Sequence, residues 1–177
     1  MLYEGLTLSQ ALAEGKVIDV SEEAAVCGFQ APDIKFVGLT RAVYDKCVLW
    51  DEEDTLKQKY TGRPEQIDPT IRLRMILFTL ARKMFVYSHK KKEFTKMREI
   101  PEHDIIRSEE AISIIYELEV VPRDGKSSGL KLMEFKAEMH DGSSKDKIVM
   151  LITFINDTSF KGTLNNVVNL FSKIRTC

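Results

Sequence analysis

Six residues in this sequence have side chains that commonly bind metals or act as nucleophiles. The cysteines are Cys27, Cys47 and Cys177, and the histidines are His89, His103 and His140. No two cysteines form a Cys-x-x-Cys pair, and no histidine is followed three or four residues on by a second histidine or cysteine. Structural zinc sites and redox pairs use such spacings. We therefore expect no metal and no cofactor, with Cys27 and Cys47 as small core residues.

The motifs that hold nucleotides or build hydrolase sites are also not expected here. The nine glycines do not spell a phosphate-binding loop, and we expect no nucleophile elbow. Paired carboxylates occur at Glu22-Glu23, Asp51–Asp54 and Glu109-Glu110, where helix starts and solvated faces are the simple interpretation. The sequence therefore predicts no catalytic residue, and a hydrolase of unrecognised type is the least favoured alternative.

Length and charge limit the classes of protein to which this chain can belong. The 177 residues fit one domain, and the balance of 26 basic against 27 acidic residues argues against a surface built wholly for nucleic acid. The longest apolar run, Ile148–Ile155, has the length of a strand rather than of a membrane span. The start of the chain does not resemble a signal peptide. We expect a soluble cytoplasmic protein with no membrane partner.

Basic residues concentrate in one stretch, where Phe85, Tyr87 and Phe94 are interleaved with them. They are Arg82, Lys83, Lys90, Lys91, Lys92, Lys96 and Arg98. Lysine and arginine bind phosphates, and aromatic rings stack on bases, so this stretch is a candidate surface for DNA or RNA. The alternative is a solvated helix end, since cations are favoured at a helix C-terminus.

The first half of the chain is predicted to be helical. Short helices begin at Thr7, with Gln10 in capping-box spacing, and at Ser21, and they end at Gly15 and Gly28. A brief β-rich run covers Lys16–Val20, a loop is marked by Pro32 and Gly38, and a third helix runs from the cap Thr40 to about Glu52. The clearest helix begins after the cap Asp68 and runs to about Ser88. Its apolar residues cover most of the circumference, which predicts packing on several sides.

The second half changes to a period of two, which indicates strands from Ser113, over Leu130–Met139 and over Lys147–Ile155. The third strand is apolar on both faces, and an edge strand of that kind invites aggregation. We expect that Lys16–Val20 pairs with it or that a terminal helix covers it. The expected fold is one α+β domain over residues 1–177, helical to about 110, with an antiparallel sheet of three or four strands over 113–156.

A terminal amphipathic helix is predicted over Thr163–Arg175. Its apolar stripe consists of Leu164, Val167, Val168, Phe171 and Ile174. Such a stripe must be buried, either on the sheet of the same chain or on a second copy in a homodimer.

Two segments of the chain share motifs with known proteins. The first holds Ala11-Leu12-Ala13-Glu14-Gly15, Ile18-Asp19-Val20-Ser21-Glu22, Cys27-Gly28-Phe29 and Leu39-Thr40-Arg41-Ala42-Val43-Tyr44 with Cys47 and Trp50, and the second holds Val121-Pro122-Arg123-Asp124-Gly125-Lys126. In this order they resemble a family of small uncharacterised bacterial proteins carried on plasmids, phages and other mobile elements. The likeness covers about residues 8–50 and 114–155. The chain departs from the family pattern in Tyr44, where tryptophan is usual, around Asp33–Val37 and Lys90–Arg107, and in the terminal helix.

The resemblance implies a context rather than a reaction, because the family has no assigned activity. Small mobile-element proteins without enzymatic motifs often block host defences by binding, as anti-CRISPR proteins do. We therefore expect a non-enzymatic binding protein whose partner is a host protein, such as a CRISPR effector nuclease. Arg41 and Tyr44 are its candidate binding residues. Arg41 would oppose the dipole at a helix start, so it needs a partner such as Asp19 or Asp45. A DNA- or RNA-binding accessory factor is the alternative.

Overall fold

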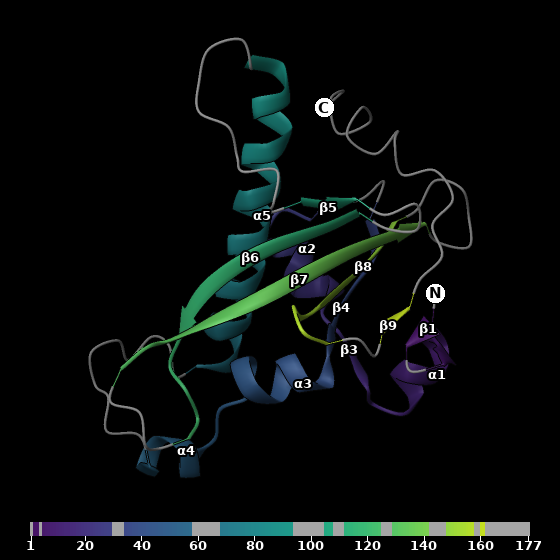
Figure 1. Cartoon of the computed structure of the whole chain (residues 1–177). Coiled ribbons are helices and arrows are strands. Elements are labelled where there is room, and N and C mark those ends of the chain that lie inside the picture. The colour runs from purple at the N-terminus through teal and green to yellow at the C-terminus, as the bar shows by residue number, and fades with distance from the viewer. Residues whose placement is uncertain are drawn as a thin grey trace.

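A mixed sheet of six strands forms the centre of the protein. The computed structural model describes residues 2–3, 5–29, 34–57, 68–93, 105–107, 112–124, 129–141, 148–157 and 160–161. The strands lie in the order β3 (Val17–Asp19), β4 (Ile34–Thr40), β8 (Ile148–Phe154), β7 (Lys131–Asp141), β6 (Ile112–Val120) and β5 (Ile105–Arg107). Neighbours are antiparallel except β4 and β8, which are parallel. The expected α+β class is therefore confirmed, but the expected antiparallel sheet of three or four strands is replaced by this mixed sheet of six (Figure 1).

The strand β8 lies inside the sheet, which explains its apolar residues on both faces. It pairs with β7 on one side and with β4 on the other, so it is not an edge strand. The run Lys16–Val20, one of the two segments expected to cover it, instead forms β3 and pairs with β4, with Ile18 opposite Leu39. A central strand of a sheet covered on both faces is buried on both, so its hydrophobic run is no hazard.

The strand β4 was missed because Gly38 and Pro32 suggested a loop. In β4 the glycine is required by packing rather than by a turn. A Cβ added to Gly38 would lie 2.6 Å from the Phe36 ring and 2.9 Å from a Val17 methyl group. Because β3 and β4 come from the N-terminal part of the chain, the division expected near residue 110 between helices and sheet does not hold.

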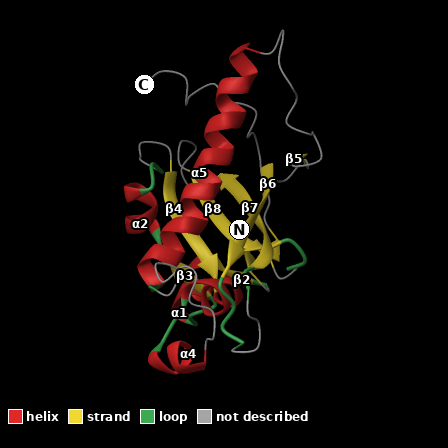
Figure 2. Cartoon of the chain, turned by 90° about the vertical axis from the view of Figure 1, so that its left-hand side faces the viewer, coloured by secondary structure: helices red, strands yellow, loops and turns green. Residues whose placement is uncertain are grey.

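Helices cover one face of the sheet and form the larger core there. They are α2 (Ser21–Val26), α3 (Arg41–Val43), the π-helix η1 (Tyr44–Val48) and α5 (Pro69–Glu93). Figure 2 shows α5 lying across this face, with its last turns extending past the strands. Leu73, Ile76, Leu77 and Leu80 of α5 are buried against strand residues such as Phe135. Tyr116, Phe135 and Phe154 stack in a row with ring centroids 5.2 and 5.8 Å apart.

The opposite face carries a smaller core under α1 (Leu8–Ala13). Ala11 packs there with Val17, Phe36, Val149 and Leu151. The short strands β1 (Leu2–Tyr3), β2 (Leu6–Thr7) and β9 (Phe160–Lys161) form a separate sheet in the order β2-β1-β9 next to α1. This second core buries the side chains of β8 that point away from α5.

The predicted helix signals were correct in most places. Thr7 and Gln10 form the capping box of α1, and Gly15 and Gly28 follow their helices with φ of 67° and 98°. Ser21 does not cap α2, because it is the first helical residue and its hydroxyl accepts a hydrogen bond from Val37 N–H at 3.1 Å. Thr40 occupies the capping position of α3, but its side chain makes no capping bond.

The start of the long helix was predicted correctly, but its packing was not. Asp68 accepts a hydrogen bond from Ile71 N–H at 2.9 Å, as a cap should, and α5 then continues through Glu93 rather than ending near Ser88. Lys90–Lys92 therefore belong to the helix and do not follow it. The prediction of packing on several sides is wrong, because Phe78 and Phe85 are exposed. The third predicted helix ends with η1, and α4 (Glu52–Lys57) is a separate helix.

Several predictions concern residues that the structure does not describe. They are the terminal helix over Thr163–Arg175, Cys177, Lys96, Arg98 and His103, and also the side chains of Lys90, Lys91, Lys92, His89 and His140.

Candidate binding surface at an arginine-linked corner

Arg123 ties together three parts of the chain at one corner of the molecule. It lies just after β6, where Figure 1 shows α4 close to the end of that strand. Its guanidinium donates to Asp54 Oδ2 at 2.6 Å, to the backbone carbonyl of Asp45 at 2.8 Å and to Asp51 Oδ2 at 3.2 Å. We call this group, with η1 and α4, the arginine-linked corner. It holds η1 and the start of α4 against the end of the sheet.

The acidic run at the start of α4 is therefore not a free acidic patch. Asp54 is buried and also accepts from Asp51 N–H at 3.1 Å, while Asp51 accepts from Asp54 N–H at 2.8 Å. The hydrogen bond from the Asp54 backbone, followed by the charge of Arg123, lowers the pKa of Asp51. Two of the four residues in this run, Asp51 and Asp54, thus contact an arginine of the same chain.

A second arginine is buried beneath the corner. Arg72 of α5 is only 3% exposed, donates to the Val121 carbonyl at 3.0 Å and lies 4.9 Å from the centroid of the Trp50 ring. Trp50 in turn donates to Thr55 at 2.9 Å. Burial lowers the pKa of Arg72 to about 10, with Cys47 acting in the opposite direction. The guanidinium thus links α5 to Trp50, which precedes α4, and to Val121, which follows β6.

The core next to this arginine contains two further polar groups. Burial raises the pKa of Cys47 to about 11, and burial followed by the charge of Cys47 raises the pKa of Tyr116 far above its usual range. Both side chains are buried, and the Tyr116 hydroxyl has no hydrogen-bond partner among the described residues. Cys27 is buried too, and burial raises its pKa as well. A thiol held protonated in the core is a poor nucleophile, as expected for both cysteines.

The candidate residues Arg41 and Tyr44 lie on the outer side of this corner. Arg41 donates to Asp45 Oδ2 at 2.9 Å, one helical turn on, so Asp45 rather than Asp19 is its partner. Its side chain is still about half exposed. Tyr44 is half-buried and packs against the larger core, while Lys46 Nζ lies 5.2 Å from the centroid of the Phe154 ring. Arg41 and Lys46 thus present positive charge at the surface.

The basic residues of the long helix do not join that corner. Arg82 is exposed and Lys83 is half-buried. At a rise of 1.5 Å per residue, Arg82 lies about 15 Å along α5 from Arg72, the residue of this helix that contacts Trp50 at the corner. The described candidates therefore form two separate groups, with Arg41 and Tyr44 in one and Arg82 and Lys83 in the other.

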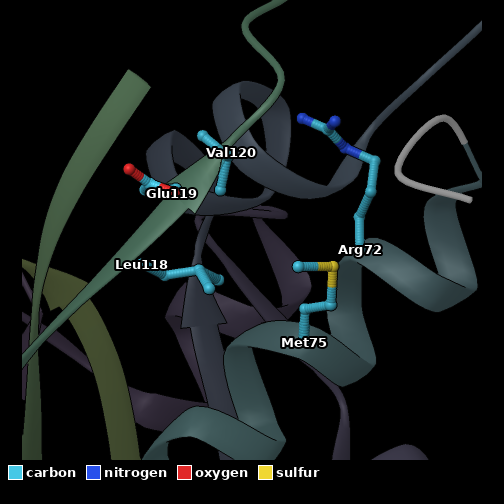
Figure 3. A pocket seen from close by; sticks show the side chains of 5 residues that line it. All are labelled: Arg72, Met75, Leu118, Glu119 and Val120. Carbon is cyan, nitrogen blue, oxygen red and sulfur yellow. The ribbon is translucent and has the colours of Figure 1, made fainter. Parts of the chain in front are cut away.

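A small hollow lies between α5 and the end of β6 (Figure 3). Its volume is about 10 Å³, and it is lined by Arg72, Met75, Leu118, Glu119 and Val120. Figure 3 shows Met75 and Leu118 pointing toward each other, with Arg72 extending past the end of the strand. This is room for about one water molecule. The hollow is a packing feature at the base of the corner.

The loop after Arg123 corrects one expectation from the sequence. Residues 125–129 spell Gly-Lys-Ser-Ser-Gly, which fits the Gly-x-Ser-x-Gly pattern that was not expected to occur. A nucleophile elbow needs a strand followed by a helix. Here β6 precedes the loop and β7 follows it, so the match lies in a hairpin connection. No group of three metal-binding side chains occurs among the described residues.

Comparisons with known proteins give no family for this chain: no protein-family model, no curated protein and no solved structure matches it. Within the described residues, no helix is long and apolar enough to cross a membrane. The features that define the site are therefore its own geometry, an arginine-stabilised corner with an exposed charged rim.

Proposed function

We propose that this chain is a non-enzymatic binding protein of a mobile genetic element, which inhibits a host defence nuclease such as a CRISPR effector in the bacterial cytoplasm. One observation carries the proposal. The two segments that resemble the mobile-element family lie far apart in the sequence, and Arg123 and Arg72 join them at one corner. A binding surface that uses both segments would lie where they meet, at this corner.

The outer rim of the corner has the composition of a protein interface. Arg41 and Lys46 are exposed on one side, and Glu52 and Glu53 are exposed on the first turn of α4. Leu56 follows on α4 and is 87% exposed. An exposed apolar side chain surrounded by charges of both signs resembles the centre and rim of a transient interface.

The side chains that could carry out chemistry near the corner have structural roles. Asp54 accepts from Arg123, Arg72 donates to the Val121 carbonyl, and Cys47 is buried with a raised pKa. These contacts fix the shape of the corner. They support a role in recognition, for which a rigid platform reduces the entropy lost on binding.

The proposal is tested by nuclease cleavage assays and pull-downs with purified defence complexes. We expect the wild-type chain to bind one effector and to block cleavage, and Arg41→Glu or Leu56→Asp to weaken inhibition at least 10-fold. Lys35→Glu and Val26→Asp are matched controls, because Lys35 is exposed at the start of β4, at the other end of that strand from Arg41, and Val26 is exposed at the end of α2. Absence of binding and of inhibition across the available effectors would remove the proposal. An equal loss in the controls would remove the corner as the site.

The alternative function is binding of DNA or RNA through the basic region 82–98. One observation favours it: α5 is continuous through Glu93, so Arg82, Lys83 and Lys90–Lys92 belong to one helix that extends past the sheet. A gel shift at two salt concentrations distinguishes the two functions. A nucleic-acid binder loses affinity steeply as salt rises, and replacing Lys90–Lys92 by glutamate abolishes its binding.

A further inference from the structure

The face of α5 that points away from the sheet carries large apolar side chains. Ile71 is 38% exposed, Phe78 52% and Phe85 60%. They recur every seven residues, so they form one line along the helix. Exposed apolar stripes of this size on a helix commonly mark a contact with another protein surface.

Two further residues complete the pattern of a coiled-coil seam. Arg82 is exposed, and Met75 is half-buried because it also lines the hollow beside β6. The positions 71, 75, 78, 82 and 85 are spaced by four and three residues alternately, which is the heptad spacing of a helix that packs along another helix. We call these five residues the outward seam.

The last described strand, β9, does not lie beside the outward seam. It ends at Lys161 and pairs with β1 in the small sheet beside α1. That is the face of the main sheet opposite α5.

We propose that the outward seam binds the outward seam of a second copy of this chain, with the two α5 helices antiparallel. A register in which Phe78 meets Arg82 of the other copy also places Met75 opposite Phe85. A guanidinium against an aromatic ring and a thioether against an aromatic ring are both favourable contacts. A two-fold axis makes each contact twice, so the seam is complementary to itself.

Charge complementarity at the helix ends supports the antiparallel direction. Asp68 caps the start of α5, and the last turn carries Lys90–Lys92. The same register places position 68 of one copy at the level of position 92 of the other, so an acidic start lies beside a basic end. The helix dipoles then also point in opposite directions. A parallel pair would bring like charges together at both ends.

This dimer is independent of the proposed inhibitor function and is tested by mass. Sedimentation equilibrium of the full chain over a range of concentrations should show a monomer–dimer equilibrium. Phe78→Glu with Phe85→Glu should raise the dimer dissociation constant at least 10-fold. Leu132→Glu is the control, since Leu132 is similarly exposed but lies on β7. A chain that is monomeric at all concentrations, or a dimer that the double variant leaves unchanged, would overturn the proposal.

The register is tested by cross-linking between two differently tagged chains, each with Cys177→Ser. Mixing a Phe78→Cys chain with an Arg82→Cys chain should give a disulfide-linked heterodimer under mild oxidation. Mixing the Phe78→Cys chain with an Ile71→Cys chain should give at least 5-fold less, because these positions lie about 16 Å apart along the paired helices in this register. Equal yields from both mixtures would exclude the register.

Discussion

The arginine-linked corner and the outward seam of α5 differ in the side chains they bury and expose. At the corner, Arg123 and Asp54 form a charged pair that is largely withdrawn from solvent. Along α5, Phe78 and Phe85 lie at the surface, although they are among the largest apolar residues of the chain. Because buried charges cost stability unless they are paired, and exposed apolar groups gain nothing from folding, the corner holds the fold together and the seam does not.

The comparison is sharpest at two neighbouring residues of α5 that differ strongly in burial. Leu77 is fully buried against the sheet, and Phe78 is about half exposed. We expect Leu77→Ala to lower the free energy of unfolding by about 3 to 4 kcal/mol, from lost burial and the cavity that remains. Phe78→Ala should cost less than about 1 kcal/mol at protein concentrations where the chain is monomeric. Urea denaturation followed by circular dichroism measures both changes.

Similar costs for the two variants would contradict this view of α5. In that case Phe78 would be covered within the monomer, and the outward seam would not be available to a second copy. Leu80→Ala serves as a second inward variant, because Leu80 is also fully buried and belongs to the same core.

The next largest effect is expected at the corner. Arg123→Ala leaves the buried Asp54 carboxylate without its charged partner, and also leaves the Asp45 carbonyl without this donor. We expect a loss of about 3 kcal/mol in the free energy of unfolding. The double variant Arg123→Ala with Asp54→Asn should recover part of this loss, because it removes the unpaired charge. Equal stability of the single and double variants would show that Asp54 is not the reason for the loss.

The strands and the long helix could be predicted from local pattern. The alternation after Ser113 gave β6 and β7, and the cap at Asp68 gave the start of α5. The strand β4 could not be found in this way, because its Gly38 is selected by contact with Phe36 and Val17, and the contact with Val17 exists only after folding. The parallel pairing of β4 with β8 joins residues more than a hundred positions apart, and no local pattern records it.

The site was predicted less well than the fold, for a related reason. The sequence left the partner of Arg41 open between Asp19 and Asp45, and the structure shows the nearer one, Asp45, one turn away. Arg123 was noted only as part of the motif from Val121 to Lys126, and its contacts with Asp51 and Asp54 span about seventy residues of sequence. The one local signal was the spacing of Asp51 and Asp54, which is that of a capping box and could have placed the start of α4.

A pH dependence above neutrality should report on the buried thiol next to Arg72. The pKa of Cys47 is raised from 9.0 to about 11 in the folded chain. A raised pKa gives stability that is complete below pH 9 and is lost as the pH rises toward 11. The loss from Cys47 is about 1.4 kcal/mol by pH 10. The buried Arg72 acts with the opposite sign. Its pKa is lowered to about 10, so above that pH the folded chain loses this buried charge and gains stability.

The measurement compares the free energy of unfolding at pH 8 and pH 10 for the wild-type chain and for Cys47→Ala. We expect the variant to lose about 1.4 kcal/mol less than the wild type over this interval, whatever its stability at pH 8. Groups that Cys47 does not influence, including Cys27, cancel in the difference. A variant that loses as much as the wild type would mean that the thiol ionises at its ordinary pKa.

The smallest effect is expected for the hydroxyl of Tyr116, which tests whether the core beside the corner is fully satisfied. The ring of Tyr116 stacks on Phe135, and its hydroxyl is buried with no hydrogen-bond partner among the described residues. Tyr116→Phe keeps the ring contact and removes a polar atom whose burial costs free energy. The free energy of unfolding should therefore stay unchanged or rise by up to about 1 kcal/mol. A loss of more than about 1 kcal/mol would show that the hydroxyl donates a hydrogen bond that stabilises the fold, and that this part of the core is as well paired as the charges at Arg123.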